Sequence, residues 1–107
     1  MKFKINNRQW EILEISQEEM KEKVKEYDGI VEETGRYFGS THPSNQKIYI
    51  DKDLVEGQKR QTLLHELMHC YILSYLFSQN GYNEEDLCNI SACSHDIINE
   101  IVTKYFK

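Results

Sequence analysis

Hydrophobic and polar residues alternate along residues 2–15, as they do in strands with one buried face. The Asn6-Asn7 pair interrupts this alternation and is typical of tight turns. The segment is therefore predicted to be a strand or a hairpin. Its apolar residues are Phe3, Ile5, Trp10, Ile12, Leu13 and Ile15.

A short charged helix is predicted to follow. Ser16 and Glu19 have the spacing of a capping box, in which the serine side chain accepts the N–H group three residues further on. The helix is expected to continue to about Glu26 and to be ended by residues 27–29, Tyr-Asp-Gly.

The pattern returns to strands in residues 35–50. Residues 35–41 are aromatic and punctuated by glycine, residues 42–45 form a turn around Pro43, and residues 46–50 alternate again. These features predict a second hairpin.

Two longer helices are predicted in the second half of the chain. Asp53 and Glu56 are expected to open the first, which runs through Gln58 to about Phe77 and is stopped by the Asn-Gly pair at 80–81. The last helix covers residues 84–106, with a core-facing stripe at three- and four-residue spacing. The stripe consists of Leu87, Ile90, Ile97, Ile98, Ile101 and Tyr105.

Strands followed by helices indicate an α+β fold. We expect a single domain over residues 1–107, with a small, mostly antiparallel sheet packed on the helix that includes residues 58–77. The C-terminal helix is expected to pack against that helix.

Composition narrows the classes of function. Of the 107 residues, 39% are hydrophobic and 29% charged, which is typical of a folded domain. The net charge of −5 argues against nucleic-acid binding, because phosphate contacts require clustered Lys and Arg. No apolar run reaches the roughly 20 residues that cross a bilayer, and the N-terminus lacks the apolar core of a signal peptide. We therefore predict a cytoplasmic protein that binds neither membrane nor nucleic acid.

The number and spacing of the cysteines agree with a cytoplasmic location. Cys70, Cys88 and Cys93 are odd in number, and their spacing matches neither a disulfide framework nor a zinc ribbon. Two of them lie in apolar helical stretches, where a free thiol behaves as a small hydrophobic side chain.

The strongest chemical signal is His65-Glu66-x-x-His69, within an apolar helical segment. Residues four apart lie one turn apart on the same helix face, so both imidazoles can reach one Zn²⁺ at about 2.0–2.1 Å. Glu66 lies about 100° further around the helix and can act as general base towards a water on the metal. The motif predicts a zinc site with Glu66 as the catalytic residue.

A catalytic zinc site needs a third protein ligand and one open position. Glu84 and Glu85 open the last helix, which can fold back on the helix of the histidines. Glu85, Asn89 and Asp96 share one polar stripe, which favours Glu85 as the ligand and the other two as residues that orient the ligands from behind. Glu84 and His95 remain alternatives for the third ligand.

A further group is expected to stabilise the negative charge of the tetrahedral intermediate. The sequence does not rank the candidates, which are Tyr49, Tyr71, Tyr82, His42 and His95. His42 precedes a proline in a turn and is expected to be exposed to solvent.

The chain resembles the small zincin metallopeptidases of the ImmA/IrrE type, which are common in phages and mobile elements. The resemblance covers roughly residues 35–100. It rests on the HELMH segment, on the predicted hairpin that ends in Ile-Tyr-Ile-Asp at 48–51, and on Glu85-x-x-x-Asn89. It implies a minimal zincin-like fold, in which the sheet packs on the HExxH helix, with Glu85 as the third ligand and Asn89 as a residue that supports it.

The resemblance also implies how a substrate binds. The segment before the HExxH helix, residues 46–50, would be the sheet edge along which a peptide lies extended. Lys47, Ile48 and Tyr49 would then face the peptide. The implied substrate is a protein or peptide, such as a phage or mobile-element repressor.

The sequence thus predicts a zinc-dependent metallopeptidase. The rival interpretation is a zinc-binding module without turnover that binds a partner protein. Glu66 favours the enzyme, because a structural site has no use for this carboxylate and closes its fourth position with Cys or His. Cys70 is displaced by about 100° from His69 and is not expected to close the site.

Overall fold

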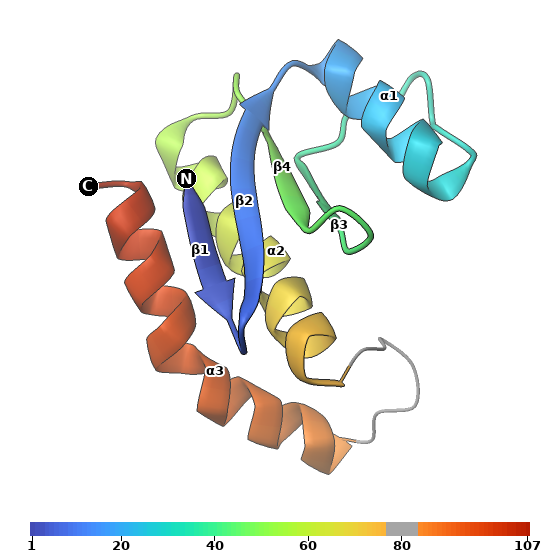
Figure 1. Cartoon of the computed structure of the whole chain (residues 1–107). Helices are drawn as coiled ribbons and strands as arrows, with labels where there is room; N and C mark the ends of the chain where they lie inside the picture. The colour runs from blue at the N-terminus through green and yellow to red at the C-terminus, as the bar shows by residue number, and fades with distance from the viewer. Residues whose placement is uncertain (77–83) are drawn as a thin grey trace.

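The computed structural model describes residues 1–76 and 84–107 (Figure 1). Within these residues the fold is α+β, as predicted, with a mixed sheet and helices on both of its faces. The strands are β1 (Lys2–Ile5), β2 (Arg8–Ile15), β3 (Gly39–His42) and β4 (Lys47–Asp51). The helices are α1 (Gln17–Asp28), α2 (Glu56–Leu76) and α3 (Glu84–Tyr105).

Both predicted hairpins are present. β1 pairs with β2 through a two-residue turn, in which Asn6 and Asn7 have φ angles of 49° and 64°. A type I′ hairpin turn requires such positive φ values at both of its central residues. β3 pairs antiparallel with β4, but residues 35–38 of the predicted first strand are irregular.

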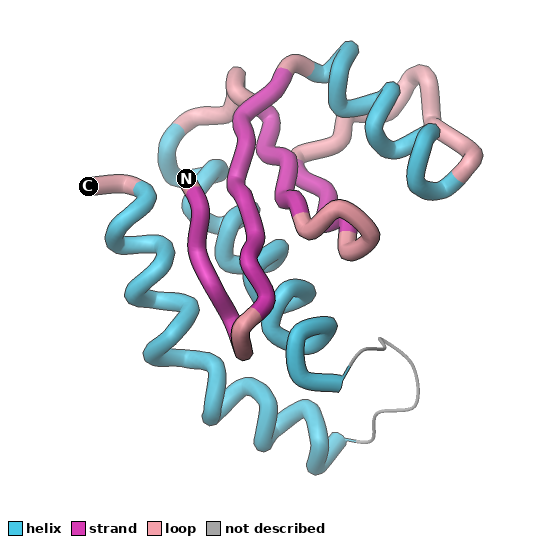
Figure 2. The backbone as a smooth tube through the Cα atoms, viewed as in Figure 1, coloured by secondary structure: helices cyan, strands magenta, loops and turns pink. Residues whose placement is uncertain are grey.

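The strand order is β1-β2-β4-β3, and the central pair, β2 with β4, is parallel. The expected mostly antiparallel sheet therefore holds for the hairpins but not for their junction. α1 and the irregular residues that follow it (Figure 2) lead to Gly39, which lies level with the C-terminal end of β2. β3 then runs antiparallel to β2, so that β4 runs in the same direction as β2.

The sheet has a different apolar cluster on each face. On one face, side chains of the strands pack with α2 and α3 in the larger cluster, which includes Trp10, Ile12, Ile48, Ile50, Leu63, Leu67, Ile98 and Ile101. On the other face, α1 packs Met20 and Val24 against Tyr49. Because successive side chains of a strand point to opposite faces, Ile48 and Ile50 belong to the larger cluster and Tyr49 to the smaller one.

The helix ends agree with the sequence only in part. The Ser16 side chain accepts the Glu19 N–H at 3.2 Å, and Gly29 ends α1 with a φ of 78°, as predicted. The predicted capping residue Asp53 is wrong, because α2 begins at Glu56 and the Asp53 N–H instead donates to the Asp51 carboxylate at 2.9 Å. The predicted stop at 80–81 lies outside the described residues.

α3 spans nearly the predicted range, but one residue of its apolar stripe is misplaced. Ile98 and Ile101 are buried, and Ile90, Ile97 and Tyr105 are partly buried against the core. Leu87 is 46% exposed, so its prediction as a core residue is wrong.

Candidate metal centre

α2 brings two imidazoles together in the middle of its length. The Nε2 atoms of His65 and His69 lie 3.2 Å apart, and the rings stand at 74° to each other. Two nitrogens bound to one tetrahedral zinc at 2.0–2.1 Å lie about 3.3 Å apart. His65, Glu66 and His69 each offer one potential ligand atom, and these atoms all lie within 4.8 Å of one another. The residues present therefore fit a zinc ion.

The sheet holds the Glu66 carboxylate in place. Its side chain is buried, with the residue 6% exposed, and the Thr41 hydroxyl of β3 donates to Glu66 Oε1 at 3.0 Å. A buried carboxylate needs such a donor, because loss of hydration without compensation is costly. The hydroxyl thus fixes one oxygen of the predicted general base.

Gly39 explains how β3 comes so close to α2. A Cβ at this position would lie 2.6 Å from Thr62 Cγ2, 3.1 Å from Glu66 Cγ and 3.2 Å from the Tyr49 carbonyl oxygen. Only a residue without a side chain allows this approach. β3 therefore runs directly beside the cluster of His65, Glu66 and His69, the candidate metal centre.

The predicted substrate strand is wrong in one respect. Residues 46–50 were expected to form a sheet edge, with Lys47, Ile48 and Tyr49 facing a peptide. β4 is instead an interior strand, paired with β2 on one side and with β3 on the other, so its backbone groups are already used. The free edge on this side of the sheet belongs to β3. The sequences of the two strands carry a signal of this order, because Gly39–His42 is polar and mostly half-buried, whereas Lys47–Asp51 contains consecutive apolar residues that are buried on both faces, as in an interior strand.

A cleft of about 530 Å³ opens beside the candidate metal centre. One wall comes from the segment that leads into β3 and includes Arg36, Phe38 and Gly39. The other wall comes from α2 and includes Thr62, His65 and Glu66. Two of the three clustered residues therefore face a space large enough for part of a peptide.

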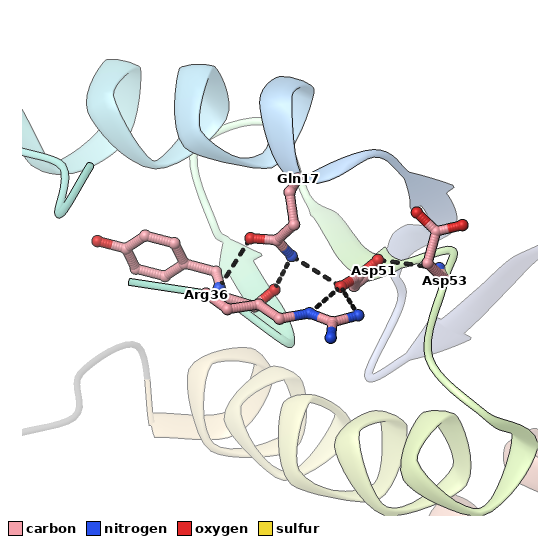
Figure 3. A network of polar contacts seen from close by, with 5 residues as sticks. Gln17, Arg36, Asp51 and Asp53 are labelled. Atoms are coloured by element: carbon pink, nitrogen blue, oxygen red, sulfur yellow. Dashed lines mark hydrogen bonds and ion pairs between the residues drawn. The ribbon is translucent and has the colours of Figure 1, made fainter. Parts of the chain in front are cut away.

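Arg36 is held over this cleft by a buried network (Figure 3). Its Nε and Nη2 atoms lie 2.8 and 2.7 Å from Oδ2 of Asp51, which has no exposed surface. The Gln17 amide donates to the same oxygen at 2.8 Å and accepts the Tyr37 N–H at 3.0 Å. The Asp53 N–H donates to Oδ1.

Burial alone would raise the pKa of Asp51. The hydrogen bonds from Asp53, Arg36 and Gln17, with the charge of Arg36, outweigh it and hold the pKa below its ordinary value. Asp51 is thus a charged, fully satisfied anchor at the end of β4. The sequence alone does not predict this network, and its one signal is a carboxylate that directly follows the apolar run Ile-Tyr-Ile.

The predicted third ligand does not lie with the histidines. Within residues 1–76 and 84–107, the cluster contains His65, Glu66 and His69 but not Glu85, which is exposed in the first turn of α3. Asn89 and Asp96, predicted to support the ligands, are exposed on the same helix. The Glu84 side chain lies outside what the structure describes.

None of the predicted oxyanion groups that are described lines the cleft. Tyr71 is buried and stacks on Tyr75 with 4.7 Å between ring centroids, and burial raises the pKa of its hydroxyl. His95 is exposed and lies 3.0 Å from the Asn99 amide nitrogen. Tyr49 is buried beneath α1. Tyr82 falls outside the described residues.

The expectation that His42 is exposed is wrong. The residue is 4% exposed, with its ring 4.8 Å from the Tyr27 ring and 4.9 Å from the Tyr49 ring. Burial lowers the pKa of the imidazole, which lies 2.7 Å from the Ser40 hydroxyl. The proline turn begins after His42, so the histidine itself still belongs to β3 and faces α1.

The cysteines divide into two kinds. Cys70 is buried in the main core as a small hydrophobic residue, and burial raises the pKa of its thiol. Cys88 and Cys93 are free thiols on the exposed side of α3, so the hydrophobic interpretation does not extend to them.

Compared with known proteins, the chain matches no family model, no curated protein and no solved structure. The resemblance to zincins of the ImmA/IrrE type therefore stays a prediction from the motif. Among the helices of residues 1–76 and 84–107, none combines the length and the apolar character needed to pass through a membrane.

Proposed function

We propose that this protein is a zinc-dependent metallopeptidase. The observation that carries the proposal is the convergence of the His65 and His69 Nε2 atoms, 3.2 Å apart, beside a buried glutamate at the wall of a cleft. His65 and His69 would hold the zinc ion. When bound, zinc would lower the pKa of a coordinated water to about 7 and polarise the scissile carbonyl.

Glu66 is the proposed general base. Its carboxylate would take the proton of the attacking water and pass it to the leaving amine nitrogen. The Thr41 hydroxyl supports this role, because it occupies one carboxylate oxygen and leaves the other for the water. Burial of Glu66 further restricts the positions that this oxygen can reach.

A peptide substrate would lie along β3. Within the described residues, this strand pairs with β4 on one side only, and Gly39 allows it to pass beside the His65–Glu66–His69 cluster. An extended peptide can add to such an edge through main-chain hydrogen bonds. This proposal replaces β4 as the docking strand and keeps the mode of binding that the resemblance implies.

The alternative function is a zinc-binding interaction module without turnover. The buried, hydrogen-bonded Glu66 and the adjacent cleft favour the enzyme, because neither is required to hold a structural metal.

The test combines metal analysis with hydrolysis of a random peptide mixture. We expect about one zinc per wild-type chain, loss of zinc in His69→Ala, and retention of zinc with at least a hundredfold loss of hydrolysis in Glu66→Gln. Full hydrolysis by Glu66→Gln would exclude Glu66 as the base. Failure of the wild type to bind added zinc would exclude the metallopeptidase itself.

A further inference from the structure

Arg36 is fixed in space although it lies in an irregular segment. Figure 2 shows that the chain between α1 and β3 has no helix or strand. Figure 3 shows the Arg36 guanidinium pointing at Asp51, where Nε and Nη2 contact the same carboxylate oxygen. An arginine held in this way loses little side-chain entropy when it binds a second partner.

One edge of the guanidinium remains open. The group has five N–H donors, and its Nε/Nη2 edge is taken by Asp51. In the part of the chain that the structure describes, Nη1 makes no hydrogen bond, so the Nη1/Nη2 edge still offers two parallel donors. That fork matches the two oxygens of a carboxylate.

The open edge belongs to the cleft beside the metal centre. The Arg36 side chain is 50% exposed and lines this cleft, with the guanidinium carbon 5.7 Å from the centre of the Phe38 ring. Among the described lining residues, Arg36 is the one with a permanent positive charge, and Glu66 is the one acid. The chain as a whole has a net charge of −5, so this fixed arginine gives the cleft a positive group that the overall charge would not predict.

We propose that Arg36 binds a carboxylate of the substrate, so that the cleft selects peptides that present a carboxylate at this position. The carboxylate is either an Asp or Glu side chain or the C-terminal group of the peptide. Asp51 and Gln17 act as positioning residues, because they aim the guanidinium without touching the substrate. This inference rests on the proposed function and specifies the substrate class of the same site.

Binding can be measured without turnover in the full-length Glu66→Gln protein, loaded with zinc. The probes are three hexapeptide pools built from Gly, Ala, Ser, Leu and Phe and labelled with the dansyl group, which carries no carboxylate. One pool is amidated and contains a single Gln, the second has Glu in place of that Gln, and the third keeps Gln but has a free C-terminus. We expect about tenfold tighter binding of the second or third pool, and the pool that gains identifies the source of the carboxylate.

The matched control removes both charges of the buried pair. Arg36→Gln alone would leave Asp51 buried without its charge partner and could unfold the chain. The double substitution Arg36→Gln/Asp51→Asn avoids this problem, and a urea titration verifies that the protein is folded. We expect the preference for carboxylate to disappear in this variant and to fall in Arg36→Lys, which offers a point charge in place of a fork.

Equal binding of the three pools by the parent protein would overturn the inference, and so would a preference that survives in the double variant. The result is separable from the proposed function. A chain that binds zinc and hydrolyses peptides with no preference that depends on Arg36 refutes the carboxylate site alone. A chain with that preference but without zinc or hydrolysis supports the carboxylate site and refutes the peptidase.

Discussion

Substitution of Gly39 by alanine tests the contact between β3 and α2 on which the site depends. The new Cβ would lie 2.6 Å from Thr62 Cγ2, about 0.8 Å closer than the 3.4 Å at which ordinary contacts begin. It would also lie 3.2 Å from a backbone oxygen of β4, which cannot rotate away. The strand, the helix or both must therefore move.

Overpacking of this kind costs about 1–3 kcal/mol. We expect Gly39→Ala to lower the free energy of unfolding by this amount, measured by urea titration with circular dichroism. Because the displaced strand carries Thr41, the hydrogen bond to Glu66 should be lost as well. Hydrolysis should then fall even under conditions where the protein remains folded.

Two further variants make the reasoning refutable. Thr62→Ser removes the methyl group at 2.6 Å, so Gly39→Ala/Thr62→Ser should recover about 1 kcal/mol relative to the sum of the single changes. Gly57→Ala, with nothing within 4 Å of its new Cβ, should leave stability unchanged or raise it by up to about 1 kcal/mol. A Gly39→Ala protein as stable as Gly57→Ala would contradict the close approach described above.

Three other predictions follow from the site. Thr41→Val should lower kcat about tenfold with little change in KM or zinc content, while Thr41→Ser should retain most activity; equal kcat values for the two variants would contradict the positioning of the base. Because the pKa of Asp51 is lowered in the folded state, its contribution to stability is present above about pH 4 and is lost as the pH falls through the folded-state pKa. Urea midpoints at decreasing pH should accordingly fall more steeply in the wild type than in Arg36→Gln/Asp51→Asn. Metal analysis should show loss of zinc in His65→Ala and retention in Glu85→Ala, because Glu85 lies outside the cluster that contains the two histidines; loss of zinc in Glu85→Ala would contradict this arrangement.

Local signals in the sequence located most of the secondary structure. The Asn6-Asn7 turn, the Ser16 cap and Gly29 each act through atoms within four residues, so their effect can be inferred without knowledge of the fold. The spacing of His65 and His69 is equally local, because helix geometry alone places the two rings together. These features were predicted correctly for that reason.

The features that were missed depend on contacts between distant segments. The parallel pairing of β2 with β4 joins two hairpins whose own patterns are complete without it. The hydrogen bond from Thr41 to Glu66 joins residues 25 positions apart, and the contact of Gln17 with Asp51 joins residues 34 apart. No periodicity or motif reports such pairs. The choice of β4 as the edge strand failed for a different reason, because its consecutive apolar residues Ile48, Tyr49 and Ile50, buried on both faces, are typical of an interior strand.

The proposed metal ligands and the proposed general base depend on different amounts of the folded structure. His65, Glu66 and His69 lie within five consecutive positions of one helix, so a single intact turn of α2 suffices to bring the two imidazoles together. The orientation of the Glu66 side chain also requires β3 to be packed against α2, because the hydroxyl that donates to Glu66 belongs to Thr41 of β3. On gradual heating, catalysis should therefore fail before metal affinity does. A zinc-loaded but inactive protein would then be an early stage of unfolding, and restored activity would be the stricter criterion of correct refolding.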